Sequence, residues 1–353
     1  MRNAMRLKNK GQGGKVSIAT LGQSARGGWL AVALGVAGVV SVLLPRLAVA
    51  QSGKATEIWL QPNSPYEAKG FAKLSGDPIW LKNGTDFWHF FSSANDANPI
   101  LKDIKVIKFS PTFVGSASKA EMESIYKWLH QHNIQLAVGI EMLTPMAGGC
   151  GRHLEGFSAS DDSVNGFLYK LKHTGADVAY FVMDEPLDFG SEVKARGACQ
   201  ASFEQTAENI LSSVKKIKAL FPNAQIGEVE GVPHTTNLAK WLAVYHSAMG
   251  SYPSVFFADV YWRFATDKQL ESWSAITRQH HIRFGVIYNA GEQKTSEEWA
   301  VAAQTNIKRI ISDPNIHVDI ALFQSWLPQP FHLLPANQVG TMSNMIQFYE
   351  HQN

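Results

Sequence analysis

Eight short runs of β-branched and aromatic residues recur along the chain, and most are separated by longer stretches with helical periodicity. Each run is four to six residues long, and they cover residues 57–60, 105–109, 135–140, 178–183, 225–229, 255–260, 283–288 and 319–323. Runs this short and this apolar are typical of parallel strands that are buried on both faces. Strand and helix alternating eight times predicts a closed (β/α)8 TIM barrel rather than an open doubly wound sheet.

The segments between these runs carry helix signals. In residues 118–132 and 203–220, apolar side chains recur at spacings of three and four, which is the pattern of a helix with one buried face. Ser118 stands three residues before Glu121, as in a capping box, and Ser296 precedes two glutamates as a second helix start. No Gly-x-Gly-x-x-Gly follows the first strand, which argues against a dinucleotide-binding fold.

Residues 1–50 have the features of an export signal. Residues 1–28 contain six lysines and arginines and no acid, and residues 29–44 form an apolar, glycine-rich run. Ala48-Val-Ala50 then offers small residues where a signal peptidase cuts. The run of 16 residues is shorter than the roughly 20 that a membrane-spanning helix needs. We therefore predict a cleaved signal peptide, residues 1–50, rather than an anchor, with Gln51 as the mature start.

The remaining residues, 51–353, contain no linker, repeat or low-complexity tract. Their length is close to that of a barrel with eight strand-helix units. No stretch among them is long and apolar enough to span a membrane. We therefore predict one catalytic barrel domain, periplasmic or secreted, without stable membrane association after signal cleavage, and expect a monomer.

The charge of the mature chain argues against polyanionic partners. The whole chain has 32 Lys and Arg against 30 Asp and Glu, but residues 1–50 hold seven of the bases and none of the acids. The mature chain therefore carries 25 bases against 30 acids, a net charge of −5, and has no cluster of bases. Nucleic acids and anionic lipids are recognised by basic surfaces. We expect neither as a partner, and predict a neutral or weakly charged ligand.

The two cysteines, Cys150 and Cys199, both lie in predicted loops. An oxidising compartment favours disulfide formation in an exported protein. Two isolated cysteines in separate loops do not match the ligand pattern of a zinc site. The sequence therefore predicts a Cys150–Cys199 disulfide, and no metal or other cofactor.

Charged, amide and aromatic residues gather at the ends of the predicted strands. They are Glu141, Asp184, Glu185, Glu228, Glu230, Asp259, Tyr261, Trp262, Tyr288, Asn289, Gln324 and Trp326. The carboxyl ends of the strands form the mouth of a (β/α)8 barrel, where active sites lie. Such a set of charges would not be tolerated inside a closed apolar core. We therefore predict a functional cluster at the mouth.

The fourth run carries the most specific signal, because it leads directly into two adjacent acids and a proline. Pro186 cannot donate a ladder hydrogen bond, so pairing should stop where Asp184 and Glu185 emerge. Side chains alternate along a strand. Asp184 and Glu185 are thus expected to point to opposite faces, and Glu228 and Glu230 to share one face, with Glu230 directed inward. The alternative is that Asp184 is a helix cap and Glu185 a solvated loop residue.

Carboxylates beside aromatic rings, without a metal-ligand pattern, suit glycosidic bond cleavage. One protonated carboxyl group donates to the leaving oxygen, and a second, ionised group activates water or attacks the anomeric carbon. We predict that two acids at the mouth divide these roles, and we choose Glu230 for the second one because its strand adjoins the one that carries Asp184 and Glu185. Neighbouring strands are about 4.8 Å apart, which favours the roughly 5–5.5 Å carboxyl separation of retaining enzymes.

The remaining residues at the predicted mouth are assigned to substrate binding. Aromatic rings at strand ends can stack on sugar rings, although the same rings could instead close the top of the barrel. Acids and amides beside them can bind sugar hydroxyl groups. The predicted substrate-binding residues are Glu141, Glu228, Asp259, Tyr261, Trp262, Tyr288, Asn289, Gln324 and Trp326.

The segment Met183-Asp-Glu-Pro186 resembles the Asn-Glu-Pro signature of the clan A glycoside hydrolases, which are (β/α)8 barrels. The likeness extends to the eight-strand pattern of the mature chain. It implies that Glu185 is the general acid/base, and we expect Asp184 to hold Glu185 or the substrate. Two positions depart from the signature: Asp184 replaces the Asn, and the seventh strand ends at Asn289 without the Glu that serves as nucleophile in the clan. The adjacent Asp-Glu pair is also similar to that of substrate-assisted hexosaminidases, in which the Asp orients a 2-acetamido group.

These observations predict an exported glycoside hydrolase that cleaves O-glycosidic bonds in a polysaccharide or oligosaccharide. Two alternatives stay open: a substrate-assisted enzyme acting on 2-acetamido sugars, and a non-catalytic saccharide-binding barrel. The sequence lacks an esterase Gly-x-Ser-x-Gly elbow, a metalloprotease His-Glu-x-x-His motif and a phosphate-binding loop.

Overall fold

Eight parallel strands close into a barrel in which each strand pairs with the next and β8 pairs with β1. The computed structural model describes residues 56–67, 86–327 and 329–352, so the predicted signal peptide lies outside the described residues. The strands are β1 (Glu57–Gln61), β2 (Ile104–Phe109), β3 (Gln135–Ile140), β4 (Val178–Asp184), β5 (Gln225–Val232), β6 (Val255–Val260), β7 (Arg283–Tyr288) and β8 (Ile320–Gln324). The predicted (β/α)8 fold is confirmed, and every predicted run overlaps a strand.

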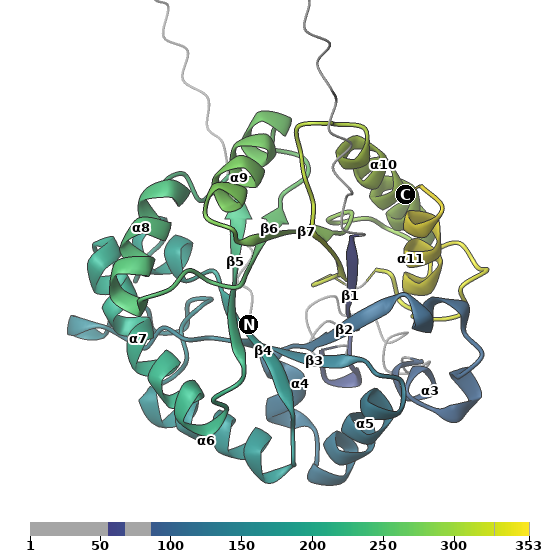
Figure 1. The fold of residues 1–353 in the computed structure, drawn as a ribbon, viewed down its shortest axis with the longest axis horizontal. Helices are drawn as coiled ribbons and strands as arrows, with labels where there is room; N and C mark the ends of the chain where they lie inside the picture. Colours follow the sequence, from purple (N-terminus) through teal and green to yellow (C-terminus); the bar gives the residue numbers. More distant parts are fainter. Residues whose placement is uncertain (1–55, 68–85, 328, 353) are drawn as a thin grey trace, which may run out of the picture. The chain divides into compact units, whose positions relative to one another are not determined.

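Helices surround the ring of strands (Figure 1). The longer ones are α4 (Pro111–Ser116), α5 (Lys119–Gln131), α6 (Asp161–His173), α7 (Phe203–Leu220), α8 (Leu238–Met249), α9 (Asp267–Gln279), α10 (Ser296–Ile311) and α11 (Met342–Glu350). Short helical segments lie between them: α3 (Phe87–Phe90), η1 (Ser93–Asn95), η2 (Pro99–Lys102), η3 (Ala147–Gly149) and η4 (Asp188–Glu192). No helix in the described part of the chain is long and apolar enough to cross a membrane.

The helix starts follow the expected capping chemistry. The Ser118 hydroxyl accepts from the Glu121 amide at 3.3 Å while the Glu121 side chain accepts from the Ser118 amide, which confirms the predicted capping box. Helix α10 begins at Ser296, but its cap is Thr295, whose hydroxyl accepts from the Glu298 amide at 3.1 Å. The predicted helix start at Ser296 is therefore confirmed, and the capping residue is the one before it.

The two faces of the strands pack in two different apolar cores. The inner core fills the barrel, where the Trp59 ring of β1 lies 4.8 Å from Tyr180 and 5.2 Å from Phe257, measured between ring centroids. The outer core lies between the strands and the helices and contains residues such as Phe181 and Phe256. Side chains alternate along each strand. At the carboxyl end of a strand, a residue two positions beyond the last inner-core residue therefore points into the mouth of the barrel.

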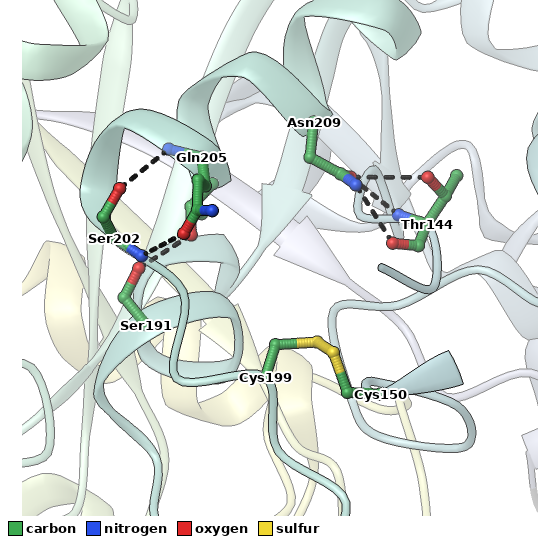
Figure 2. The surroundings of a disulfide bond; sticks show 8 residues. Thr144, Cys150, Ser191, Cys199, Ser202, Gln205 and Asn209 are labelled. Atoms are coloured by element: carbon green, nitrogen blue, oxygen red, sulfur yellow. Dashed lines mark hydrogen bonds between the residues drawn. A yellow bond between two sulfur atoms is a disulfide. The ribbon is translucent and has the colours of Figure 1, made fainter. Parts of the chain in front are cut away.

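The two cysteines are joined in a disulfide, as predicted, with their Cα atoms 5.0 Å apart (Figure 2). Cys150 lies in the segment that connects β3 to α6, and Cys199 lies in the segment that connects β4 to α7. The bond therefore links two neighbouring loops on the side of the barrel where β3 and β4 end.

Candidate active site

Asp184 and Glu185 both lie at the mouth of the barrel, at the carboxyl end of β4. Asp184 follows the inner-core residues Tyr180 and Val182 in alternation, so it points inward. Glu185 has a φ of 46°, in the left-handed region, and its amide donates to the Val229 carbonyl at 3.0 Å. This backbone turn breaks the strand alternation. The prediction that the two acids point to opposite faces was therefore wrong.

The Glu185 side chain lies over Gly231 of β5. A Cβ atom built at Gly231 would lie 3.1 Å from the Glu185 Oε1 atom, so a side chain there would compete with the carboxyl group for space. Gly231 also pairs in register with Asp259 of β6. The carboxyl groups of Glu185 and Asp259 are thus brought together across one residue that has no side chain.

The surroundings of Glu185 disfavour the ionised form of its carboxyl group. Only 2% of the residue is exposed, and its Oε1 atom has no hydrogen-bond partner among the residues that the structure describes. Burial raises the pKa of Glu185 well above its usual value, and the nearby charges of Asp259, Glu155 and Asp184 raise it further. This position therefore favours the protonated form of the Glu185 carboxyl group.

Lys108 places a buried amino group on the inner face of β2. It is 5% exposed, and its Nζ atom donates to the Gln324 Oε1 atom of β8 at 3.2 Å. Burial lowers the pKa of Lys108, while the charges of Asp184 and Asp259 oppose that change. The sequence analysis missed this residue, although a signal existed: Lys108 follows Val106 by two positions in a strand-forming run and must share its face.

Two further glutamates enter the site from the side of β3. Glu141 lies just beyond β3, and burial, followed by the charges of Asp184 and Glu155, raises the pKa of Glu141 to about 7. Glu155 belongs to the β3–α6 segment and was not among the predicted residues. It comes from a loop far from any strand end in the sequence, so no strand pattern pointed to it.

Glu228 and Glu230 share one face of β5, as predicted, but that face is turned toward the helices. Val229 between them belongs to the inner core, so its neighbours point outward. Glu228 accepts from the Trp241 Nε1 atom of α8 at 2.5 Å. Burial raises the pKa of both glutamates. The predicted inward direction of Glu230 was wrong, and Glu228 is also remote from the mouth.

Glu230 instead holds the turn that follows Glu185. Its carboxylate accepts from the amides of Leu187 at 2.6 Å and Asp188 at 3.1 Å, and from the Thr235 hydroxyl at 3.1 Å. These bonds fix the chain two and three residues after Glu185. Glu230 can therefore influence Glu185 through the backbone without facing a ligand in the mouth.

The predicted aromatic residues divide between the mouth and the outer core. Tyr288 is fully buried in the outer core, with its ring centroid 5.4 Å from that of Tyr349, so its predicted place at the mouth was wrong. Trp262 packs against the same core and stacks on Tyr288 at 6.3 Å. The reason is again the strand alternation, which turns Tyr288 outward because Ile287 points inward.

Tyr261 and Trp326 are the predicted aromatic residues that lie beside the mouth. A Cβ atom at Gly231 would lie 3.3 Å from the Tyr261 ring, which places this ring next to the Glu185 side chain. Trp326 is half-buried and packs against the inner core.

Two amides complete the mouth. Gln324 accepts the hydrogen bond from Lys108. Asn289 follows the inward-facing Ile287 by two positions, is 2% exposed, and accepts from the Gly291 amide at 2.9 Å. Its Nδ2 atom has no hydrogen-bond partner among the described residues. Within those residues, no group of three or more His, Cys, Asp and Glu side chains is arranged to hold a metal ion.

Comparisons with known proteins define the fold but not the chemistry. No protein-family model matches the chain, and no curated protein matches its sequence. GH5_18 from Streptomyces cattleya, solved in complex with GlcNAc, has a TM-score of 0.51 and 10% identity, over 85% of this chain and 81% of its own. One of two fungal beta-1,4-galactanases has a TM-score of 0.49 and 11% identity, over 83% and 98%.

A third solved structure is also similar to this chain. A truncated 3-deoxy-D-arabino-heptulosonate 7-phosphate synthase from Thermotoga maritima also matches, with a TM-score of 0.42 and 9% identity, over 84% of each chain. Identities this low show the shared barrel fold alone. Because one fold hosts many chemistries, the function has to be argued from the residues at the mouth.

Proposed function

We propose that the protein is a glycoside hydrolase in which Glu185 is the general acid. The observation that carries this proposal is the state of Glu185, a buried carboxyl group at the mouth whose pKa is raised by burial and by neighbouring acids. A carboxyl group that keeps its proton at neutral pH can protonate the oxygen of a leaving sugar. The exported location expected from the sequence suits a polymer or oligosaccharide substrate outside the cytoplasm.

Asp259 is the second catalytic carboxylate in this proposal, in place of Glu230. It faces the mouth from β6, and its charge is the strongest of those acting on Glu185. It also interacts with the ammonium group of Lys108, which favours a negative charge on a neighbouring carboxylate. Glu185 and Asp259 would thus divide the two roles, with one neutral acid and one charged base or nucleophile.

The carboxyl separation expected for this pair favours retention of anomeric configuration. The Glu185 side chain lies over β5, and Asp259 belongs to the adjacent strand β6. One strand spacing is about 4.8 Å, which is nearer to the roughly 5–5.5 Å of retaining enzymes than to the roughly 6.5–9.5 Å of inverting ones. Product anomers followed by proton NMR from the first turnovers would decide this point.

The test of the proposal compares three variants on polysaccharides and on aryl glycosides. Glu185→Gln should lower hydrolysis of the natural polymer roughly 10²–10⁴-fold and affect activated aryl glycosides much less, because these need no proton donor. Asp259→Ala should be inactive until azide is added, and then release a glycosyl azide. Glu292→Gln, an exposed site beyond β7, is the matched control. Wild-type turnover of the polymer by Glu185→Gln would overturn the proposal.

A substrate-assisted reaction on 2-acetamido sugars is the second candidate. It is favoured by one observation: Asp184 and Glu185 both face the mouth, whereas β7 ends at Tyr288, is followed by Asn289 and supplies no carboxylate. Asp184 would then orient the acetamido group, and the acetamido oxygen would attack the anomeric carbon. Under this scheme Asp259→Ala should keep most activity, and aryl glycosides with a 2-hydroxyl should be poor substrates. Binding of saccharides without any turnover would instead indicate a non-catalytic barrel.

A further inference from the structure

Glu155 reaches the site from a loop that lies against the end of β4. The Leu143 amide donates to the Gly156 carbonyl at 3.1 Å, and the Ser158 amide donates to the Leu143 carbonyl at 2.8 Å, which closes the loop at its base. A Cβ atom at Gly156 would lie 2.7 Å from the Asp184 carbonyl oxygen. The residue next to Glu155 therefore touches the backbone of the catalytic strand.

The disulfide and two sets of hydrogen bonds hold this loop in place. At its start, the Asn209 Oδ1 atom of α7 accepts from the Thr144 amide at 2.8 Å (Figure 2). In its middle, Cys150 is bonded to Cys199, and the adjacent Gly151 amide donates to the Gly197 carbonyl at 2.8 Å. The half of the loop that contains Glu155 thus begins at the covalent link.

The buried ring of Phe157 fixes the other end of that half. A Cβ atom at Gly151 would lie 2.2 Å from the Phe157 ring, so the ring packs directly under the residue that follows Cys150. Glu155 lies between these two contacts. Its position depends on both the disulfide and the packing of Phe157.

Glu155 is an acid that a loop brings close to Glu185, whereas the acids at strand ends are placed by the barrel itself. It raises the pKa of both Glu185 and Glu141. The other titratable groups around Glu185 and its neighbours are Lys108, Glu141, Asp184, Glu230 and Asp259, together with Tyr261 and His234 beside Gly231. Displacement of the loop would therefore move the Glu155 charge away from Glu185 and leave the charges carried by the strands in place.

We propose that Glu155 is a positioning residue for Glu185 and that the Cys150–Cys199 disulfide holds it at the site. A like charge nearby disfavours ionisation of a carboxyl group, so Glu155 helps Glu185 to retain its proton. Reduction of the disulfide releases the loop and removes this effect. Glu185 then has its full proton affinity only in the oxidised chain. This is in keeping with a protein that works after export. The consequence for turnover rests on the proposed hydrolase function.

Titration of Glu185 by carbon-13 NMR tests the proposal without any substrate. The side-chain carboxyl signals of labelled glutamates are followed against pH, and the Glu185→Gln variant identifies the Glu185 signal. Glu155→Gln and the double variant Cys150→Ser/Cys199→Ser should each lower the Glu185 midpoint. Adding Glu155→Gln to the double variant should produce little further change. Glu292→Gln should leave the midpoint where it is in the wild type.

An unchanged midpoint in Glu155→Gln, or fully additive shifts in the triple variant, would overturn the proposal. Gly156→Ala supplies a second route if the cysteine variant does not fold, because it pushes the loop away from the Asp184 carbonyl with the disulfide intact. It should lower the midpoint as well. If the protein proves to be a hydrolase, the alkaline limb of its pH profile should move to lower pH in Glu155→Gln, since the acid must be protonated to act.

Discussion

At the scale of single residues, the mouth of the barrel combines the buried Lys108 side chain with carboxyl groups whose pKa values are raised. Such groups reduce stability at the pH where they are forced to lose their protons. This loss of stability is expected at a catalytic site, because residues that serve function often lower the free energy of unfolding.

Glu141 gives the clearest pH prediction. Its pKa is raised to about 7 by burial and by the charges of Asp184 and Glu155, so the folded chain binds a proton that the unfolded chain releases above pH ~4.3. Stability associated with this group is therefore fully present below pH ~4.3 and is lost as the pH rises toward about 7. Relative to the wild type, Glu141→Gln should therefore gain about 2–3 kcal/mol of stability between pH 5 and pH 8.

Urea denaturation of both proteins at pH 5 and pH 8 measures this difference. Glu123→Gln, an exposed position on α5, provides a control that should show no such gain. The same difference in stability between Glu141→Gln and the wild type at both pH values would show that Glu141 ionises normally.

Lys108 gives the second residue-scale prediction. Replacing it with methionine keeps most of its volume but leaves Asp184 and Asp259 without their buried cation. Removing one partner of a buried ionic group costs about 3–5 kcal/mol, so Lys108→Met should lose stability by about that amount at pH 7. Lys105→Met, on the exposed face of the same strand, should change it by less than about 0.5 kcal/mol. Equal losses in guanidinium denaturation would contradict a buried charge network.

At the scale of elements, the sequence pattern identified all eight strands because each is a short apolar run between helical segments. It could not decide which face of β5 points inward. Glu228 and Glu230 alternate around Val229, and alternation fixes only that they share a face. The face is set by the closure of the barrel, which places Val229 among the inner-core residues. The backbone turn at Glu185 was equally hidden, because a non-glycine residue with positive φ has no reliable sequence signal.

Strand β5 yields the prediction that separates support from catalysis. Glu230 accepts three hydrogen bonds from Leu187, Asp188 and Thr235, so Glu230→Gln should weaken these bonds and lower stability by about 1–3 kcal/mol. Activity should fall because Glu185 is held less firmly, and azide should not restore it. Azide should restore Asp259→Ala. Formation of a glycosyl azide by Glu230→Ala would return the nucleophile role to Glu230.

At the scale of the whole molecule, export and disulfide formation belong together. The leader, residues 1–50, lies outside the described residues, so its cleavage stays a prediction from sequence. The disulfide, by contrast, joins the loops after β3 and β4, and a bond closing a loop of this size is typically worth about 2–4 kcal/mol. A chain kept in a reducing compartment would therefore lose stability, and the loop that carries Glu155 would lose its covalent restraint.

Producing the protein in two forms tests these expectations at once. Exported from the full sequence, it should begin at Gln51, and its intact mass should correspond to no free thiols. Produced from residue 51 in a reducing cytoplasm, it should contain two alkylatable thiols, unfold about 2–4 kcal/mol more easily, and regain the difference on oxidation. A membrane fraction that still carries residues 29–44 would refute cleavage. Equal stability of the oxidised and reduced forms would show that the packing of Phe157 and the Asn209 contacts hold the loop without the covalent link.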